Sequence, residues 1–105
     1  MEFEITVIEA FERMQKSEEL QLLDLRPAQD FQKKSIPGFV NLPMSELSAE
    51  LGQLGGKKTT LLLCEDGSKS HQARVLLEAC GYPSLVIRGG MKDWEGIIEP
   101  ALGDI

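Results

Sequence analysis

The sequence predicts an α/β domain built around a mostly parallel β-sheet. Short apolar runs that suit buried strands alternate along the chain with longer segments whose apolar residues recur at helical spacing. The 105 residues are enough for one compact domain, and we expect residues 1–105 to form a single domain. The hydrophobic share of 42% and the charged share of 27% are close to those of globular proteins.

The N-terminal half of the chain predicts two helices and two strands. In order, these are a helix over residues 6–16, a buried strand over 20–25, a polar helix over 29–33 and a short strand over 39–42. Thr6 followed by Glu9 has the pattern of a capping box at the start of the first helix. Pro27 ends the first strand and Pro43 ends the second.

The C-terminal half predicts two further helices and two further strands. They are a helix through residues 47 and 51, a central strand over 59–63, a helix from 70 to 80, a buried strand over 84–87 and a short segment over 91–95. Ser45 is expected to cap the first of these helices. The glycine-rich stretch 52–56 ends that helix, and the basic pair 57–58 leads into the central strand.

Charge and hydropathy exclude several classes of partner. A formal net charge of -6 and a pI near 4.7 argue against a broad surface for nucleic acid or anionic membrane. The N-terminus has no basic start followed by an apolar run, and no stretch approaches the roughly 20 apolar residues that span a bilayer. We therefore expect a cytoplasmic protein, and the sequence leaves its oligomeric state open.

The two cysteines, Cys64 and Cys80, are too few for a disulfide framework. With His71 as the only histidine they do not make a four-ligand zinc site, so we predict no metal centre. Cys80 continues the apolar stripe of the predicted helix over residues 70–80, which also contains Ala73, Leu76 and Leu77. This pattern predicts a core position for Cys80.

Cys64 stands between the central strand and the following helix. The unpaired N–H groups and the positive dipole end of a helix N-terminus stabilise an anion at such a position, and the thiolate is the reactive form of a cysteine. Gly67 allows the backbone to turn sharply, so that successive N–H groups can form a concave anion nest. In open α/β sheets ligands bind beyond the carboxyl ends of the strands, which is where Cys64 lies.

Several sequence blocks resemble the rhodanese-like domain family in their order and spacing. They cover roughly residues 3–95 and are Leu23-Asp24-Leu25-Arg26, Asp30-Phe31, Ile36-Pro37-Gly38-Phe39-Val40-Asn41-Leu42-Pro43, Cys64-x-x-Gly67-x-Lys69-Ser70, Gly81-Tyr82 and Gly89-Gly90-Met91-x-x-Trp94. A lone Cys-x-x-Gly is a weak signal, whereas this series of blocks is specific. The resemblance implies a sheet of about five strands with helices on both faces.

The resemblance also implies a sulfurtransferase or sulfur carrier. Cys64 would take a sulfane sulfur from thiosulfate, another small donor or a persulfide protein, and would pass it to a thiol, cyanide or a protein acceptor. The substrate-binding residues would be Glu65, Asp66, Gly67, Ser68, Lys69 and Ser70, through their backbone N–H groups. Asp24 and Arg26 would support the pocket, with Arg26 paired to Asp30, and the chemistry needs no cofactor.

The loop departs from the family pattern in its charge. Glu65 and Asp66 follow the cysteine where a basic residue is common, and Lys69 stands where arginine is common. This net negative loop predicts that thiosulfate is a poor donor and that a neutral, cationic or protein-bound donor is preferred. It also favours the alternative function, a catalytically weak or inactive module that docks a basic partner.

Other interpretations compete for single residues. Phosphatases of similar fold place arginine after a cysteine and five intervening residues, but Ser70 holds that position here. Cys64 alone would also suit an inert core cysteine. His71 lies on the polar stripe of its helix and is expected to face solvent rather than act as a base. Asp24 and Arg26 suit a structural ion pair at least as well as a catalytic pair.

Overall fold

A computed structural model describes residues 3–16, 19–54 and 58–103 and contains a five-stranded sheet. The strands are β1 (Glu4–Ile5), β2 (Leu20–Asp24), β3 (Val40–Asn41), β4 (Thr59–Leu63) and β5 (Ser84–Ile87). Their order is β1-β5-β4-β2-β3, and every neighbouring pair is parallel. The predicted α/β fold with a parallel sheet of about five strands is confirmed.

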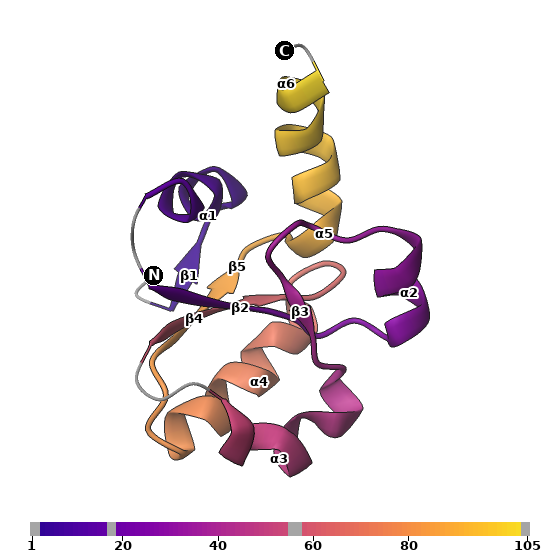
Figure 1. Cartoon of the computed structure of the whole chain (residues 1–105). Coiled ribbons are helices and arrows are strands. Elements are labelled where there is room, and N and C mark those ends of the chain that lie inside the picture. The colour runs from indigo at the N-terminus through magenta and orange to yellow at the C-terminus, as the bar shows by residue number, and fades with distance from the viewer. Residues whose placement is uncertain (1–2, 17–18, 55–57, 104–105) are drawn as a thin grey trace.

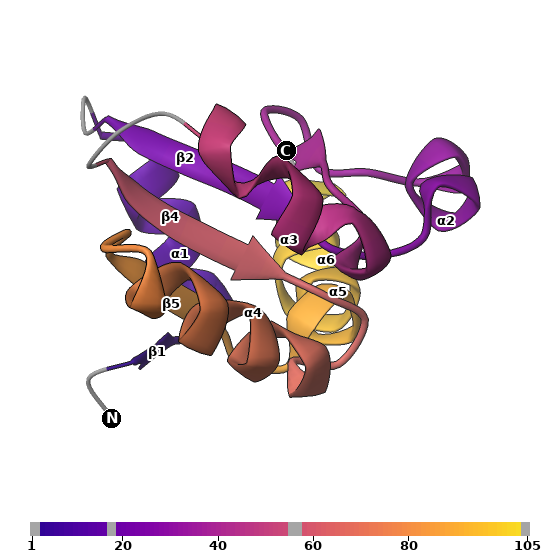
Figure 2. The ribbon, with the colours of Figure 1, turned by 90° about the horizontal axis from the view of Figure 1, so that it is seen from below.

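Helices cover both faces of the sheet, as predicted (Figure 1). Helix α1 and the C-terminal α5, η3 and α6 lie on one face, and α3 and α4 lie on the other (Figure 2). The helical elements are α1 (Val7–Met14), α2 (Ala28–Lys33), η1 (Met44–Glu46), α3 (Leu47–Glu50), η2 (Leu51–Gln53), α4 (Ser68–Ala79), α5 (Gly90–Asp93), η3 (Trp94–Ile98) and α6 (Glu99–Gly103).

The sheet separates two hydrophobic clusters, which we call the α1 cluster and the α4 cluster. Because successive side chains of a strand point to opposite faces, Leu61 and Leu63 of β4 pack into the α1 cluster. Leu62 and Cys64 join the α4 cluster instead. The alternation along β4 therefore turns Cys64 toward the helix whose N-terminus follows it.

Local sequence signals explain how α1 and α4 begin and end. The Thr6 hydroxyl accepts a hydrogen bond from the Glu9 N–H at 3.1 Å, and the Glu9 carboxylate accepts one from the Thr6 N–H at 2.8 Å. This capping box confirms the predicted start of α1. Gly81 follows the Cys80 C-cap with a left-handed φ of +84°, so α4 ends within one residue of the predicted end at residue 80.

The prediction of a buried Cys80 was wrong. Cys80 is exposed, because α4 ends at it and its backbone has already left the helical conformation. The buried stripe of α4 consists instead of Ser70, Ala73 and Leu77, and Leu76 is 36% exposed. The helix also begins at Ser68, two residues earlier than predicted.

The predicted cap at Ser45 was also wrong. Pro43 takes the N-cap position of η1, so Ser45 lies inside that turn, and α3 begins at Leu47 without a side-chain cap. Residues 55–57 of the predicted glycine and lysine stretch lie outside the described residues, and Lys58 is exposed. Strand β1 was not predicted, because its two residues are too few for a strand pattern.

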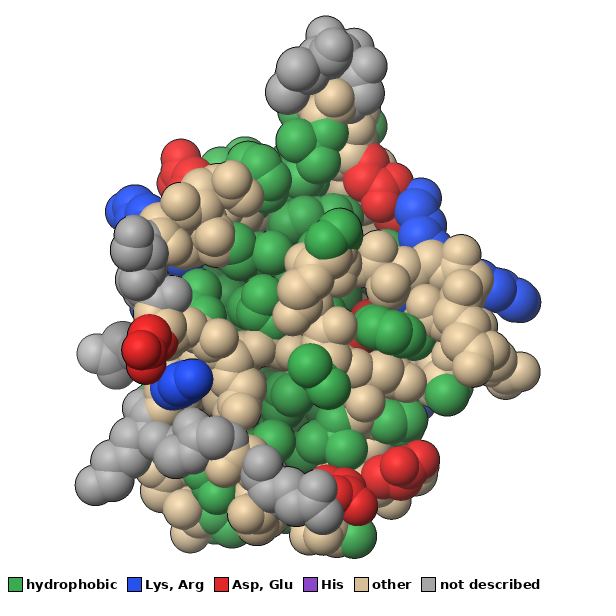
Figure 3. All heavy atoms as spheres, viewed as in Figure 1, with side chains coloured by type: hydrophobic (Ala, Val, Ile, Leu, Met, Phe, Trp, Pro, Cys, Tyr) green, Lys and Arg blue, Asp and Glu red, His purple; other side chains and the backbone are tan. Residues whose placement is uncertain are grey.

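The C-terminal segment is longer than predicted and forms a continuous helical run from Gly90 to Gly103. The run contains a π-helical turn, in which the Glu99 N–H donates to the Trp94 carbonyl. Pro100 has no N–H to donate, which favours this irregularity. Figure 3 shows hydrophobic side chains gathered between α1 and this run, which projects from the body. None of the helices in the described ranges is long and apolar enough to cross a membrane.

Candidate active site

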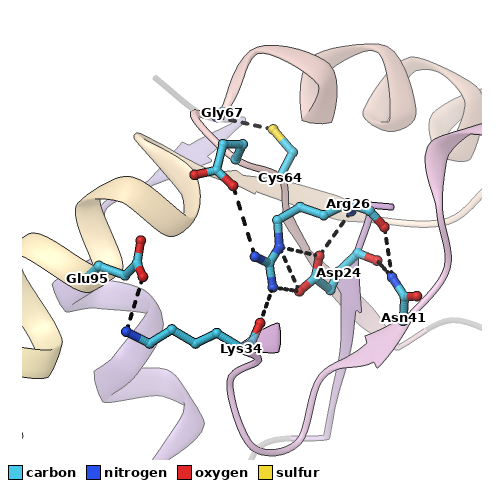
Figure 4. Close-up of polar contacts among 8 residues, drawn as sticks. Asp24, Arg26, Lys34, Asn41, Cys64, Gly67 and Glu95 are labelled. Atoms are coloured by element: carbon cyan, nitrogen blue, oxygen red, sulfur yellow. Dashed lines mark hydrogen bonds and ion pairs between the residues drawn. The ribbon is translucent and has the colours of Figure 1, made fainter. Parts of the chain in front are cut away.

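Cys64 lies at the carboxyl end of β4, with its side chain held against the start of α4. The Gly67 N–H donates a hydrogen bond to the Cys64 Sγ at 3.1 Å (Figure 4). Gly67 is the N-cap of α4 and has a left-handed φ of +94°. A Cβ at Gly67 would lie 3.1 Å from the Gly89 nitrogen, so both the conformation and the space require glycine. The predicted sharp turn at Gly67 is confirmed.

The N-terminus of α5 holds the cysteine loop from the other side. The Met91 N–H donates to the Cys64 carbonyl at 2.8 Å, and the Lys92 N–H donates to the Glu65 carbonyl at 3.0 Å. Gly90 makes this approach possible, because a Cβ there would collide with the Cys64 carbonyl oxygen and lie 2.8 Å from the Glu65 carbonyl carbon. In the sequence Gly90 is one residue of the Gly89-Gly90-Met91-x-x-Trp94 block, and its close contact with the cysteine loop was not predicted.

Asp24 and Arg26 form a buried ion pair beside the loop (Figure 4). The Arg26 Nε lies 3.0 Å from the Asp24 Oδ1, and the Arg26 Nη2 lies 2.8 Å from the Asp24 Oδ2. The Arg26 Nη2 also donates to the Lys34 carbonyl at 2.7 Å, and the Asn41 amide donates to the Asp24 and Arg26 carbonyls. The hydrogen bonds that Arg26 donates to the Asp24 carboxylate raise the pKa of Arg26, so the guanidinium is a fixed, permanent charge.

A pocket of about 260 Å³ opens between this ion pair and the cysteine loop. Its lining residues are Leu25, Arg26, Pro27, Asp30, Cys64, Glu65, Asp66, Ser68 and Lys69. Of the predicted binding residues, Gly67 contributes its N–H to the sulfur. Ser70 is fully buried on the inner face of α4 and does not line the pocket. The structure thus brings Cys64 together with Arg26 and with five of the six predicted loop residues, four of which line the pocket while Gly67 binds the sulfur. Asp24 does not line the pocket and joins the site as the partner of Arg26.

Asp66 uses part of the hydrogen-bonding capacity of the loop. Its carboxylate oxygen Oδ1 accepts from the Ser68 N–H at 3.0 Å and from the Ser68 hydroxyl at 2.7 Å. These hydrogen bonds hold the pKa of the Asp66 carboxyl below its usual value of 3.8. The Ser68 N–H at the start of α4 is therefore engaged by the protein's own carboxylate.

The comparison with known families matches this geometry. The rhodanese-like domain family matches residues 7–97, most of the chain. The chain belongs to this family. That assignment confirms the family resemblance seen in the sequence blocks around Asp24, Cys64 and Gly89.

Two curated relatives of this rhodanese-like domain have names that refer to sulfur transfer, and their sequence identity to it is modest. The putative sulfurtransferase YtwF of Bacillus subtilis (strain 168) is 28% identical over 97 residues, which cover 92% of this chain and 94% of that protein. The putative sulfur carrier protein YrkF of the same organism is 29% identical over 94 residues. That match covers 88% of this chain but only 51% of YrkF, so the chain spans about half of that relative.

Two solved structures support the same fold. A protein of Staphylococcus saprophyticus, SSP1007, superposes with a TM-score of 0.82 at 29% identity, covering 90% of this chain and 93% of that chain. A rhodanese-like domain protein of Staphylococcus aureus superposes with a TM-score of 0.82 at 25% identity, covering 87% of this chain and 89% of that chain. The five-stranded parallel sheet is thus shared along almost the whole length of these chains.

The partner of Arg26 in this rhodanese-like domain is Asp24, so the expected pairing with Asp30 was wrong. Asp30 lines the pocket and acts on Arg26 only through its charge. Asn41 was not predicted as part of the site, although its place in a short strand next to β2 is a signal for contact with residues 24–26. Asp24 and Arg26 thus form a buried, hydrogen-bonded ion pair with each other, one of the two arrangements that the sequence allows.

His71 lies outside the pocket and is half exposed, as predicted. Its Nε2 lies 2.9 Å from the Glu4 carboxylate, which also faces Arg88 at 3.4 Å. Met91 and Trp94 are buried packing residues of the α1 cluster. Trp94 contacts Phe11 edge to face, with ring centroids 6.0 Å apart.

Proposed function

We propose that Cys64 accepts a sulfane sulfur as a persulfide and passes it to a thiol, to cyanide or to a protein acceptor. The observation that carries this proposal is the hydrogen bond from the Gly67 N–H to the Cys64 Sγ at the start of the 12-residue helix α4, in a pocket open to solvent. A helix N-terminus favours negative charge, and both the thiolate and the persulfide anion carry it. Relatives named as sulfur carriers and sulfurtransferases support the same class of chemistry.

The transfer consists of two displacements at sulfur. In the first, the Cys64 thiolate attacks the outer sulfur of the donor, a new Sγ–S bond forms, and the donor S–S bond breaks with its electron pair on the leaving thiolate or sulfite. In the second, the acceptor attacks the outer sulfur of the persulfide, and the Cys64 thiolate leaves. Neither step changes the total number of electrons on the reactants, so no redox cofactor takes part.

The structure around Cys64 suits a sulfur atom that forms a bond in the first displacement and breaks it in the second. Gly67 and the α4 N-terminus stabilise the anion, while α5 fixes the Cys64 and Glu65 carbonyls. Asp24 and Arg26 fix the opposite wall of the pocket through a bidentate ion pair. We infer that these two residues position the pocket rather than react, and that the protein works in the cytoplasm, where thiols stay reduced.

A second candidate function is an interaction module that docks a basic partner without turnover. Glu65 and Asp66 are exposed at the pocket mouth, and Asp30 lines the same pocket, which together favour a positively charged surface. The alternative requires Cys64 to be a core residue only, and its 2% exposure suits that role. The two functions differ in whether sulfur reaches Cys64.

Sulfur transfer to cyanide tests the proposal. The protein is supplied with a small-molecule persulfide and, separately, with thiosulfate, and the thiocyanate formed is measured for the parent, Cys64→Ser and Cys80→Ser. We expect turnover in the parent and in Cys80→Ser, and none in Cys64→Ser. If a folded parent forms no thiocyanate above the Cys64→Ser background with either donor, the docking module becomes the better account.

A further inference from the structure

We propose that Arg26 is the anion-recognition group of the pocket and that Glu65 occupies it, so that the pocket excludes small dianions and selects persulfide donors with neutral or basic surroundings. This inference rests on the proposed sulfur transfer and names its substrate class. It gives Arg26 and Glu65 a role in donor specificity, in addition to the structural role of Arg26 in its ion pair with Asp24.

The guanidinium of Arg26 has one nitrogen directed to the pocket. Asp24 engages Nε and Nη2, and the Lys34 carbonyl engages Nη2 again. In the part of the chain that the structure describes, Nη1 makes no hydrogen bond, and its nearest charged neighbour is the Glu65 Oε1 at 4.0 Å. An arginine fixed on one edge and open on the other presents donors in a set direction toward an incoming anion.

Glu65 faces the open edge of Arg26 from the mouth of the pocket, where an incoming anion would have to replace it. Its side chain is 53% exposed, and that of Arg26 is 5% exposed. At 4.0 Å the contact is an ion pair without a hydrogen bond, so the Glu65 carboxylate faces Nη1 through its charge and leaves the hydrogen-bonding capacity of Nη1 unused. Glu65 therefore acts as a built-in anion that competes with any external anion for Arg26.

The second oxyanion donor of the pocket is occupied in the same way. Asp66 accepts the N–H and the hydroxyl of Ser68 at the start of α4. The pair of Asp24 and Arg26 adds no net charge to the pocket, and the one charge of Lys69 stands against the three of Glu65, Asp66 and Asp30. A dianion such as thiosulfate would meet a pocket of the same sign, in which Asp66 already accepts from Ser68 and Glu65 already faces Arg26.

A persulfide donor avoids both obstacles. In R–S–SH the outer sulfur carries no oxyanion, so it needs neither Arg26 nor Ser68 to bind. The Cys64 thiolate attacks that sulfur and a new Sγ–S bond forms. The S–S bond of the donor breaks with its electron pair on the inner sulfur, so that R–S⁻ leaves and the proton stays on the transferred sulfur. Basic groups near R would pair with the carboxylates of the pocket mouth, which favours a donor with positive surroundings.

Loading of Cys64 by two donors tests this assignment. The second-order rate constants with thiosulfate and with the persulfide of N-acetylcysteine amide, which has no carboxylate, are measured by intact mass for the parent, Glu65→Gln and Asp30→Asn. Glu65→Gln releases Arg26 and should shift the ratio of the two constants toward thiosulfate by about tenfold or more, the worth of one charge-assisted hydrogen bond. Asp30→Asn removes the same charge from the same pocket without releasing Arg26, and should shift the ratio by less than about threefold. Equal shifts of the ratio in the two variants would mean that only the net charge of the pocket matters, and would overturn the proposed role of Arg26.

An unreactive anion separates this inference from the proposed function. Sulfate is titrated into the parent and into Glu65→Gln while the Arg26 Nε–H resonance is followed by NMR. Saturable movement in Glu65→Gln, with binding at least about tenfold weaker in the parent, supports the assignment even if neither donor loads Cys64. Equal binding, or no movement in Glu65→Gln, contradicts it even if sulfur transfer is observed.

Discussion

Arg26 lines the pocket together with Cys64, and Asp24 holds Arg26 in place. Both side chains are almost fully buried and pair with each other, and Arg26 also donates to the Lys34 carbonyl. The Asn41 side-chain amide donates to the backbone carbonyls of Asp24 and Arg26. Breaking such a pair leaves one buried charge without a partner, which costs more than the pair contributes. The pair therefore makes the pocket geometry sensitive to either residue.

Asp24→Ala should lower the free energy of unfolding by about 3–5 kcal/mol, because Arg26 would stay buried without its carboxylate. Urea denaturation at neutral pH measures this loss. Glu78→Ala is the matched control, since it removes the exposed partner of Arg74 on α4, where a pair contributes no more than about 0.5 kcal/mol. Similar losses in the two variants would mean that the buried pair has no special weight.

The hydrogen bonds from Ser68 should be visible in the titration of Asp66. Because they hold the pKa of Asp66 below 3.8, the carboxylate stays charged to a lower pH in the folded protein than in the unfolded chain. The resulting stabilisation is complete above pH 3.8 and is lost as the pH falls through the folded pKa. NMR titration should place the midpoint below 3.8 and move it upward in Ser68→Ala. An unchanged midpoint in Ser68→Ala would assign the shift to another group.

At the scale of elements, the loop between β4 and α4 is shaped by the start of α5. The Met91 and Lys92 N–H groups bind carbonyls of the cysteine loop, and only a glycine at position 90 allows this approach. The starts of α4 and α5 thus meet at one loop. The start of α4 binds the sulfur of Cys64, and the start of α5 binds the backbone carbonyls of Cys64 and Glu65.

Gly90→Ala should lower both the stability and the rate of Cys64 loading, because its Cβ would push the Cys64 carbonyl and the loop aside. Gly81→Ala serves as the control, since Gly81 also has a positive φ but nothing lies within 4 Å of a Cβ there. Both variants carry the strain of a left-handed residue, about 1–2 kcal/mol, and the excess in Gly90→Ala measures the clash. Equal losses of stability in the two variants, with normal loading of Cys64 in Gly90→Ala, would show that the close contact between residue 90 and the cysteine loop does not matter.

The elements that could be predicted from the sequence are those with complete local signals. The capping box at Thr6, the five-residue apolar strand before Cys64 and the left-handed Gly81 each depend on neighbours in the chain. Features that depend on contacts distant in sequence were missed or misassigned. The approach of Gly90 to Cys64 spans 26 positions of the numbering, and no local pattern encodes it. The exposure of Cys80 depends on where α4 ends, and apolar spacing does not determine that point.

In the whole molecule, one sheet joins the α1 cluster and the α4 cluster. Trp94 is 4% exposed in the first cluster, and Leu77 is fully buried in the second. Adjacent residues of β4 face opposite clusters, so neither cluster can open without disturbing the strand that leads into Cys64. This arrangement predicts that the two clusters unfold together.

Trp94→Ala should cost about 3–5 kcal/mol and Leu77→Ala about 2–5 kcal/mol, because each leaves a cavity in a packed cluster. Chemical denaturation followed by fluorescence and by circular dichroism should give a single coincident transition for Leu77→Ala. Leu102→Ala, at a position 43% exposed on α6, is the control and should change stability by less than about 0.5 kcal/mol. Two separate transitions would show that the clusters are independent.

The central claim is that sulfur is carried on Cys64, and peptide mapping after loading tests it most directly. The protein is treated with a persulfide donor, freed of the donor, alkylated and digested, and the peptides containing Cys64 and Cys80 are compared by mass spectrometry. We predict one additional sulfur on the Cys64 peptide, its removal by cyanide, and none on the exposed Cys80. Sulfur on Cys80 instead, or on neither peptide of a folded protein, would contradict the account.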